Sequence, residues 1–594
     1  MAKSDARFEY RAKLNRESHN LGEPFGFTCA PGMLLPVFED IATPGDTYYI
    51  NHDVEYLRTL PLTAPAMIDV KVHLESFFVP FQMIYQPIEQ TLYSMLQPMS
   101  QLFQIEQSSR WLNQNFPLMD YSVYRDNVMS TASVSASVEH SDAFRIADML
   151  GLNADNFAWD ANNPSRFKYA PSFFPWQLLA YQTIFQYFYR LDDKTRFSNL
   201  ACNYDSWYNS STAGGGAELF EIHQRPWDFD YFTSMYRSPI VSNASMQAVM
   251  KSDAYTSLLD SSVLQIPIKS NGYTASGVND NNSVVSFAAN ALTDPTVALT
   301  FQQGVNTAMI RQLFANEKLS MITGRARKTY DAQVLAHFGV EVPHDPKHDI
   351  AFIGRDTYEI KIGEVTSLAS SSTAGLGDLA GKGWAAGKSK GHKFTAPCHG
   401  VVMTIFSVEP RKRYYGGFDR INALTNAFDI PTPEFDRLGN MPMFRYEAGE
   451  NAGSGVVTAT DIIGWKERYY YNKRRHPKVT LAFQNNRTYA QLYNNRSAYM
   501  LTSTPFGAIT STNNNTARPD LESRFYIDRN CMDGMMLQPY IDEWQEGSEG
   551  QLTSENWNKT PWLAYARDPF IVDLDMKVKK VSWLSKDGEP IYTF

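Results

Sequence analysis

The residues 383–389 (GWAAGKS) end like a phosphate-binding loop. A Walker A loop needs four residues between its glycines, because successive backbone N–H groups must wrap the phosphate. Here three residues separate Gly383 from Gly387, and no apolar strand leads into the segment. We therefore expect no nucleotide site at these residues.

Two histidine patterns resemble metal sites. His344 and His348 have the spacing of an i, i+4 ligand pair, but Pro346 between them prevents the helical turn that would align their side chains. A metal-binding cupin needs a clustered His-x-His with a carboxylate, which His392 and His399 do not supply. The chain also lacks a G-x-S-x-G elbow. We expect no catalytic residue, no cofactor and no metal, and hence no enzyme.

Two segments mix basic and aromatic residues, namely 411–415 (RKRYY) and 465–475 (WKERYYYNKRR). Cations neutralise phosphates, and unpaired bases stack on aromatic rings with about 1 to 3 kcal/mol per base. Arg and Tyr are also enriched at protein interfaces, so subunit contacts are slightly favoured over contacts with single-stranded DNA. With a basic N-terminal arm, residues 1–16, the candidate contact residues are Lys3, Arg7, Arg11, Lys13, Arg16, Arg411, Lys412, Arg413, Tyr414, Lys473, Arg474 and Arg475.

Composition indicates a packed molecule that is rich in contacts. Hydrophobic residues make up 43% of the 594 residues and charged residues 20%, which excludes wholesale disorder, and 13% aromatic residues favour strands and large interfaces. A net charge of -9 argues against a surface that binds nucleic acid everywhere, but not against one basic face. The four cysteines show no C-x-x-C pair. Without an N-terminal apolar segment, we expect a soluble protein made in the cytoplasm.

Alternating residues predict strands near both ends of the chain. Apolar and charged residues alternate over 68–75 and again over 572–579, so each segment should bury one face and expose a charged one. Pro44 and Gly45 predict a type II turn at 43–46 between two strands. We expect both termini to lie in one sheet system.

Other elements are expected between these ends. Residues 401–408 are apolar on both faces and predict a central strand, and 172–191 predict a helix buried on most sides. Residues 307–338 predict one or two amphipathic helices that stop at Gly339. Surface loops are expected at 130–163, 199–216 and 242–293, and a flexible glycine-rich segment at 367–393.

Several motifs resemble, in order, those of the major capsid proteins of the Microviridae, especially the gokushovirus-like branch. The opening from Ser18-His19-Asn20-Leu21 to Phe77-Phe78-Val79-Pro80 is similar, as is the fairly specific Asp230-Tyr231-Phe232-Thr233-Ser234. Further similar segments are Phe174-Pro175-Trp176, 325–330 (RARKTY), His337-Phe338-Gly339-Val340 and 464–469 (GWKERY), where Lys466 replaces a Gln of the usual pattern.

The resemblance implies a mainly β fold, an eight-stranded antiparallel viral jelly roll with large, partly helical insertions. It implies one domain, 1–594, with candidate insertions at 91–220, 240–395 and 411–560. Residues 242–293, within the second of these, are the candidate for an outward projection. It further implies pentamers in a 60-copy T=1 icosahedral shell around a circular single-stranded DNA genome. Other phage structural proteins and a host surface receptor are the implied partners, and the virion capsid, assembled in the bacterial host cytoplasm, is the implied location.

Two other functions stay open from the sequence. A glycan-binding jelly-roll spike or lectin would use exposed Trp and Tyr as sugar platforms and would form a small oligomer. A hydrolase would require a polar cluster that converges in a pocket.

Overall fold

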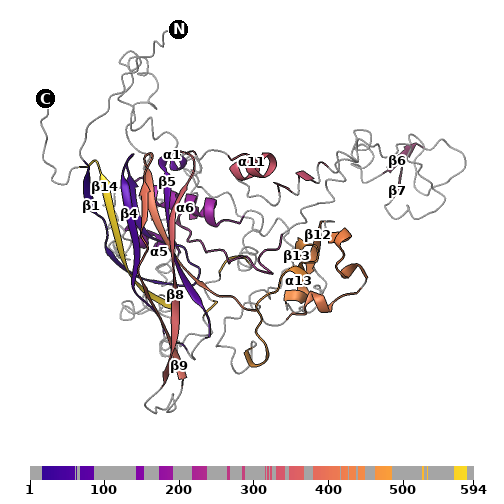
Figure 1. Ribbon diagram of the computed structural model, residues 1–594. Coiled ribbons are helices and arrows are strands. Elements are labelled where there is room, and N and C mark those ends of the chain that lie inside the picture. Colours follow the sequence, from indigo (N-terminus) through magenta and orange to yellow (C-terminus); the bar gives the residue numbers. More distant parts are fainter. Residues whose placement is uncertain are drawn as a thin grey trace, which may run out of the picture.

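The largest sheet of the described residues folds over into two antiparallel layers, called here the two sheets, which pack face to face. The computed structural model describes residues 16–60, 62, 67–85, 142–152, 173–191, 217–236, 264–267, 284–287, 315, 318–319, 322–323, 330–341, 345, 347–366, 379–414, 417–425, 427–436, 439–448, 462–483, 525–527, 531–532 and 568–584. Figure 1 shows the strands gathered on one side and the smaller elements around β12, β13 and α13 on the other.

The strand order is that of a jelly roll. One sheet has the order β2 (Pro24–Cys29), β14 (Phe570–Ser582), β4 (Thr47–Thr59) and β9 (Leu379–Gly387). The other has the order β3 (Leu35–Ala42), β11 (Gly400–Pro410), β5 (Val70–Pro80) and β8 (Ala351–Thr366). Every pairing is antiparallel, and the chain changes sheet at all but one of the connections between these strands. The predicted eight-stranded jelly roll is confirmed.

Two short strands and one corner complete the sheets. The end of β8 pairs with β9, which joins the two sheets along one side. β1 (Glu17–Asn20) pairs with β14 beyond β2, and β10 (His392–Thr395) pairs with β4. Because β1, β2 and β14 are neighbours, the first and last described strands lie in one sheet, as the alternating patterns predict.

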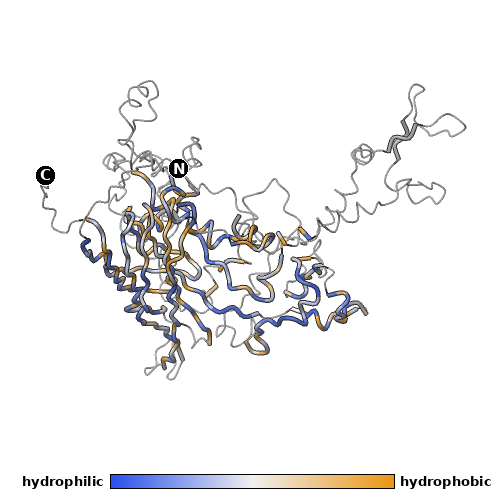
Figure 2. The backbone as a smooth tube through the Cα atoms, turned by 45° about the horizontal axis from the view of Figure 1, so that its top comes forward, coloured by the Kyte–Doolittle hydropathy of each residue, from blue (hydrophilic) through white to orange (hydrophobic). Residues whose placement is uncertain are grey.

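Alternation and turn chemistry fix the strands as predicted. In β14 the apolar residues at 572, 574, 576 and 578 are buried, and Asp573, Lys577 and Lys579 are exposed. All of β11 is buried between β3 and β5. Gly45 has a φ of +89°, and the Asp46 N–H donates to the Thr43 carbonyl oxygen at 3.0 Å. This turn carries the chain from β3 in one sheet to β4 in the other. Figure 2 shows hydrophobic and hydrophilic residues alternating along the strands.

The predicted charged outer face of β5 is only partly correct. Lys71 is exposed, but His73 and Glu75 are buried. Tyr189 donates a hydrogen bond to Glu75 and Arg225 forms an ion pair with it at 2.8 Å. Both residues belong to the long connection between β5 and β8, which therefore covers this face of the sheet. Alternation alone could not reveal a distant segment that supplies partners for buried charges.

The glycine-rich segment is not wholly flexible, because residues 379–387 form β9 and residues 392–395 form β10. A Cβ on Gly387 would lie 2.2 Å from the Tyr358 ring, and a Cβ on Gly383 would lie 2.7 Å from Thr59. Glycines here allow neighbouring strands to approach closely. The predicted insertion 240–395 is corrected at its end, since β8, β9 and β10 all belong to the jelly roll.

Two long connections emerge from the sandwich, at 81–350 and at 411–569. The first contains α1 (Phe81–Ile84), α5 (Asp142–Met149), α6 (Trp176–Ile184), the π-helical η5 (Phe185–Tyr189), η6 (Ala217–Phe220), the paired β6 (Leu264–Pro267) and β7 (Val284–Phe287), and α11 (Tyr330–Phe338). The second contains η8 (Arg420–Asn422), η9 (Ala427–Asp429), α12 (Pro433–Asp436), β12 (Asn440–Phe444), η10 (Arg445–Ala448), β13 (Ile462–Glu467), α13 (Tyr470–Lys473) and η11 (Leu481–Phe483).

The helices agree with prediction in part. α6 is buried along most of its length, as expected for 172–191. The α11 helix ends at a left-handed Gly339, whose N–H donates to the Leu335 carbonyl oxygen. Helix α5 corrects the predicted loop 130–163, because its Ile146 and Ala147 are buried in the core. Most of the other predicted loops lie outside the described residues. No helix among the described residues is long and apolar enough to span a membrane.

Candidate functional site

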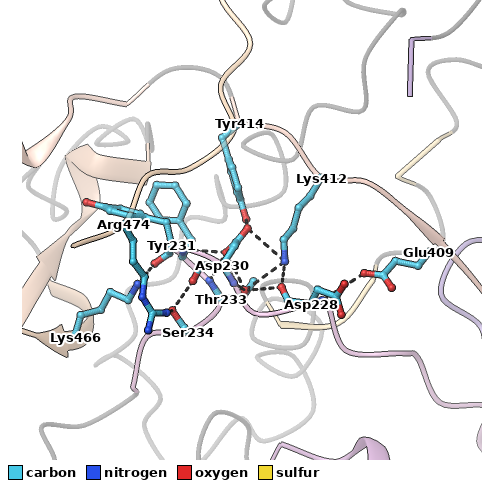
Figure 3. Close-up of polar contacts among 11 residues, drawn as sticks. Asp228, Asp230, Tyr231, Thr233, Ser234, Glu409, Lys412, Tyr414, Lys466 and Arg474 are labelled. Atoms are coloured by element: carbon cyan, nitrogen blue, oxygen red, sulfur yellow. Dashed lines mark hydrogen bonds and ion pairs between the residues drawn. The ribbon is translucent and has the colours of Figure 1, made fainter. Parts of the chain in front are cut away.

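The two long connections meet in a polar junction, which we define as residues 228–234 together with 412–414 and 466–478. Figure 3 shows Asp228, Asp230 and Thr233 of the first connection facing Lys412 and Tyr414 of the second. The backbone of Tyr414 forms an isolated β-bridge with that of Lys478, and the Tyr414 N–H donates to the Pro477 carbonyl oxygen at 3.0 Å. The structure thus brings together two basic segments that lie about 60 residues apart in sequence.

Asp230 organises the turn at the centre of this junction. Its Oδ1 accepts hydrogen bonds from the N–H groups of Phe232 at 3.0 Å and Thr233 at 2.9 Å. Its Oδ2 accepts from the Tyr414 hydroxyl at 2.7 Å and lies 3.3 Å from the Lys412 ammonium. Asp and Thr side chains commonly fix turns in this way. One carboxylate therefore holds its own loop with one oxygen and the neighbouring connection with the other.

Two of the candidate contact residues, Lys412 and Tyr414, lie inside this junction. The Lys412 ammonium donates to the Asp228 carbonyl oxygen and to Thr233, and both side chains are buried within the chain. A buried ammonium is stable only when such partners replace its water. Within the chain, these two side chains join the second connection to the first.

A second buried group lies beside the first. Lys466 is fully buried, donates to the Tyr231 carbonyl oxygen and lies over the Tyr231 ring at 4.9 Å. Tyr231 and Tyr470 both donate to the Glu447 carboxylate, at 3.1 and 2.6 Å. Burial raises the pKa of Glu447 above its usual value, despite these bonds. The residue that departs from the usual Gln of the family motif is therefore part of the packing between the two connections.

His476 occupies an aromatic pocket in the same junction. The rings of Tyr231, Phe232 and Tyr414 lie 5.0, 5.1 and 5.9 Å from its ring. Burial, followed by the nearby Lys478 charge, lowers the pKa of His476 to about 4. The imidazole is therefore neutral at neutral pH.

The remaining basic residues of the second segment are exposed. Lys473 pairs with Asp436, and Arg474 lies 3.4 Å from Glu467 and donates to the Ser234 hydroxyl at 3.3 Å. Arg475 is exposed and has no ion-pair partner within the described part of the chain. Exposed pairs of this kind contribute at most about 1 kcal/mol, so these cations remain available to a ligand.

The other predicted contact residues are dispersed. Arg411 is exposed and pairs with Asp69, while Arg413 is half-buried. Arg16 lies over the Trp583 ring at 4.3 Å, beside the first and last strands. The arm residues Lys3, Arg7, Arg11 and Lys13 lie outside the described residues.

Residues that the sequence analysis missed form a buried charge group on the outer face of β5. Arg225 lies 2.8 Å from Glu75 and 3.6 Å from Glu409, and His73 lies 3.2 Å from Glu409. Burial opposes ionisation of Glu75, but the Arg225 charge and the Tyr189 hydroxyl hold its pKa below the usual value. The only sequence signal was the Arg-Pro-Trp that precedes the Asp-Tyr-Phe-Thr-Ser motif.

The polar junction and the buried charge group on β5 have a structural role. Their buried charges bond to one another and to backbone groups, and they hold the two long connections against the jelly-roll sandwich. The fold and the polar junction define a β-sandwich protein of the viral jelly-roll class, in which long connections between strands are part of the folded core.

Comparison with known proteins gives the family. The model of the family described as "Capsid protein (F protein)" matches residues 10–105 and 167–544. The chain is also similar to "Capsid protein VP1" of Chlamydia phage 1, with 22% identity over 609 aligned positions that cover 88% of this chain and 94% of the relative. Because the family model covers most of the chain, the chain belongs to the F-protein capsid family and is a major capsid protein of the Microviridae type. The resemblance seen in the sequence is confirmed, and the comparisons lend no support to a lectin.

Proposed function

We propose that copies of this chain assemble through pentamers into a closed, 60-copy T=1 shell around a circular single-stranded DNA genome. Heterologous contacts close into rings when the rotation between copies allows it. The observation that supports this proposal most directly is a jelly-roll sandwich whose long connections follow the capsid family along most of the chain. Electron microscopy of the purified protein tests it, since five-fold symmetric shells support the proposal and a small oligomer contradicts it.

The contacts between subunits are proposed to involve the two long connections. Among the described residues of these connections, the most exposed large apolar side chains are Leu481 (83%), Phe338 (77%) and Phe229 (62%). Leu481 also has a φ of +57°, which costs energy for a branched residue without a partner to fix it. An exposed leucine in a strained conformation is explained if a neighbouring copy packs on it.

Leu481→Asp tests this contact. We expect the variant to fold with an unchanged melting temperature but to form few shells, because the charge would be buried at an interface. Leu584→Asp is the matched control, since Leu584 is also exposed but lies beyond the end of β14. Equal shell yields from both variants and the unmodified chain would remove Leu481 from the interface.

DNA contact is proposed for the exposed residues 473–475. Replacing Lys473, Arg474 and Arg475 by Ala should lower the DNA content of the particles and make it less dependent on salt, because fewer counterions are released on binding. The control replaces Lys361, Lys382 and Lys388, exposed on or next to β8 and β9. If neither empty nor DNA-filled shells form, residues 473–475 are subunit contacts instead.

The N-terminal arm is proposed to lie across a neighbouring subunit or on the inner wall of the shell. Its basic residues suit either place, and Arg16 on Trp583 anchors its end near the terminal strands. Deletion of residues 1–16 should reduce assembly or DNA content. Unchanged particles with a full genome would disprove a role for the arm.

We further propose that the shell assembles in the bacterial host cytoplasm. Its other proposed partners are further structural proteins of the phage and a receptor on the host surface. The outward projection proposed for 242–293 contains the paired strands β6 and β7, and the rest of this segment lies outside the described residues. Particles with this segment shortened should assemble normally but bind host cells less well.

A further inference from the structure

A histidine and aspartate cluster lies inside the sandwich, where the two sheets face each other. His52 comes from β4, Asp356 from β8 and His392 from β10, so the three residues belong to elements of both sheets. Their nitrogen and oxygen ligand atoms all lie within 4.8 Å of one another. His52 is fully buried, Asp356 is nearly so and His392 is half-buried.

The three side chains converge on one oxygen atom. Asp356 Oδ2 lies 2.8 Å from His52 Nδ1 and 3.0 Å from His392 Nε2, and it also accepts a hydrogen bond from the Ser389 hydroxyl. A carboxylate oxygen has about two lone-pair sites, and three polar side chains lie within hydrogen-bonding distance of this one. A cation between the two imidazole nitrogens and this oxygen could accept a lone pair from each of them.

The surrounding residues hold the cluster in place. His52 Nε2 lies 2.7 Å from the Ser76 hydroxyl, which lies 2.8 Å from the Thr404 hydroxyl. If His52 donates its Nε2 proton to Ser76 and Ser76 donates to Thr404, the Nδ1 lone pair is left for a metal. Metal-ligating histidines almost always have such a second partner.

A glycine makes room for the third ligand. A Cβ on Gly354 would lie 2.1 Å from the His392 ring, two residues before Asp356 on the same strand. His392 can therefore lie with its Nε2 3.0 Å from Asp356 Oδ2.

We propose that His52, Asp356 and His392 bind one divalent transition-metal ion, with the Ser389 hydroxyl or water as a fourth ligand. Two imidazoles and one carboxylate are a ligand set that Zn²⁺ accepts in four-coordinate geometry. Each neutral imidazole binds through one nitrogen lone pair and keeps its single proton on the other ring nitrogen, so no proton has to leave the site. The ion fastens β4, β8 and β10 together close to the corner where β8 joins the two sheets.

The experiment uses the full-length protein, freed of metal with a chelator and then titrated with Zn²⁺ and with Co²⁺. We expect about one ion per chain, the visible absorption of four-coordinate Co²⁺, and a melting temperature that rises with Zn²⁺ concentration because the ion binds the folded state. Binding well below stoichiometric amounts, with a melting temperature that Zn²⁺ does not change, would overturn the proposal and leave a hydrogen-bonded cluster only.

Two histidine variants assign the ion to this cluster. His392→Asn should weaken Zn²⁺ binding by on the order of 10-fold or more. Loss of a residue that only hydrogen-bonds to a metal ligand already lowers metal affinity by about that factor. His348→Asn should bind as the unmodified chain does, because His348 is exposed in a loop beside Asp345. Equal binding by both variants, or equal loss, would overturn the assignment. If His392→Asn does not fold, the Zn²⁺ dependence of the unmodified chain decides.

Discussion

Arg225 is the only cation within 4 Å of both buried carboxylates, Glu75 and Glu409, among the described residues. Its side chain is buried, whereas Arg355, the other cation bonded to Glu75, is half exposed. Removing one partner of a buried ion pair leaves an unpaired charge in a poorly solvated site. The two arginines therefore bond to one carboxylate with very different consequences for stability.

Replacement of each arginine by Ala tests this difference. We expect Arg225→Ala to lower the free energy of unfolding by about 3 to 5 kcal/mol and Arg355→Ala by about 1 kcal/mol. Thermal and denaturant unfolding of the two variants provide the measurement. Equal losses would show that burial of Arg225 does not determine its contribution.

His476 makes the junction sensitive to acid. Its pKa in the folded chain is about 4, below the unfolded value of about 6.5. Its contribution to stability is therefore complete above about pH 6.5 and is lost as the pH falls through 4.

We expect His476→Asn to be less stable than the unmodified chain at pH 7 and to lose less of its stability between pH 6.5 and 4. Between pH 6.5 and 4, the unmodified chain should lose at most about 3 kcal/mol more of its free energy of unfolding than the variant does. Melting temperatures across this pH range provide the measurement, with His348→Asn as the control at an exposed histidine. Parallel curves for all three proteins would contradict the assignment.

At the scale of the element, β9 shows how a glycine-rich sequence becomes a strand. Tyr358 on β8 lies over Gly387, and its hydroxyl donates to the His52 carbonyl oxygen at 2.7 Å. The aromatic ring fills the space that the glycine leaves free. Composition predicts a flexible segment here, because the partner that orders it lies 29 positions away in sequence.

Gly387→Ala should therefore destabilise the chain by about 1 to 3 kcal/mol through overpacking against Tyr358. Gly363→Ala, in β8, is the control, since a Cβ there meets nothing closer than 3.9 Å. Thermal unfolding compares the two variants. A neutral Gly387→Ala would mean that the ring moves aside freely.

The strands of the sandwich were predictable because they follow local rules. Alternation in β14, the apolar run of β11 and the Pro44-Gly45 turn each encode their structure within a few residues. The junction was not predictable, because burial of Lys412, Tyr414 and Lys466 depends on two connections folding against each other. A basic, aromatic sequence has the same composition whether it faces DNA or a buried carboxylate.

For the whole molecule, the connection 81–350 is part of the folded core, because it supplies the partners of the buried charges on β5. Phe78 and Ala351 are paired neighbours at its two ends, so a short turn could replace residues 81–350 without separating the strands. We expect such a shortened chain to be unstable and to aggregate.

The cause of this expected instability, the loss of Arg225 as a partner of two buried carboxylates, can be tested in the same shortened chain. Added Glu75→Val and Glu409→Val substitutions should recover part of the soluble, folded protein, because they remove the carboxylates that lose Arg225. Soluble yield and circular dichroism of both shortened chains provide the measurement. A shortened chain that folds well without these substitutions would show that the connection is dispensable for folding.

One outer strand has a consequence for how copies can join. β3 pairs only with β11 among the described residues, so no further strand continues the sheet on its other side. Pro36 on this strand lacks an N–H group, and Asp40 forms an ion pair with Lys580 at 2.8 Å. Proline and charge on an open edge discourage hydrogen bonding to a further strand. Pairing of two copies edge to edge through β3 is thereby opposed, and contacts between copies are left to other surfaces.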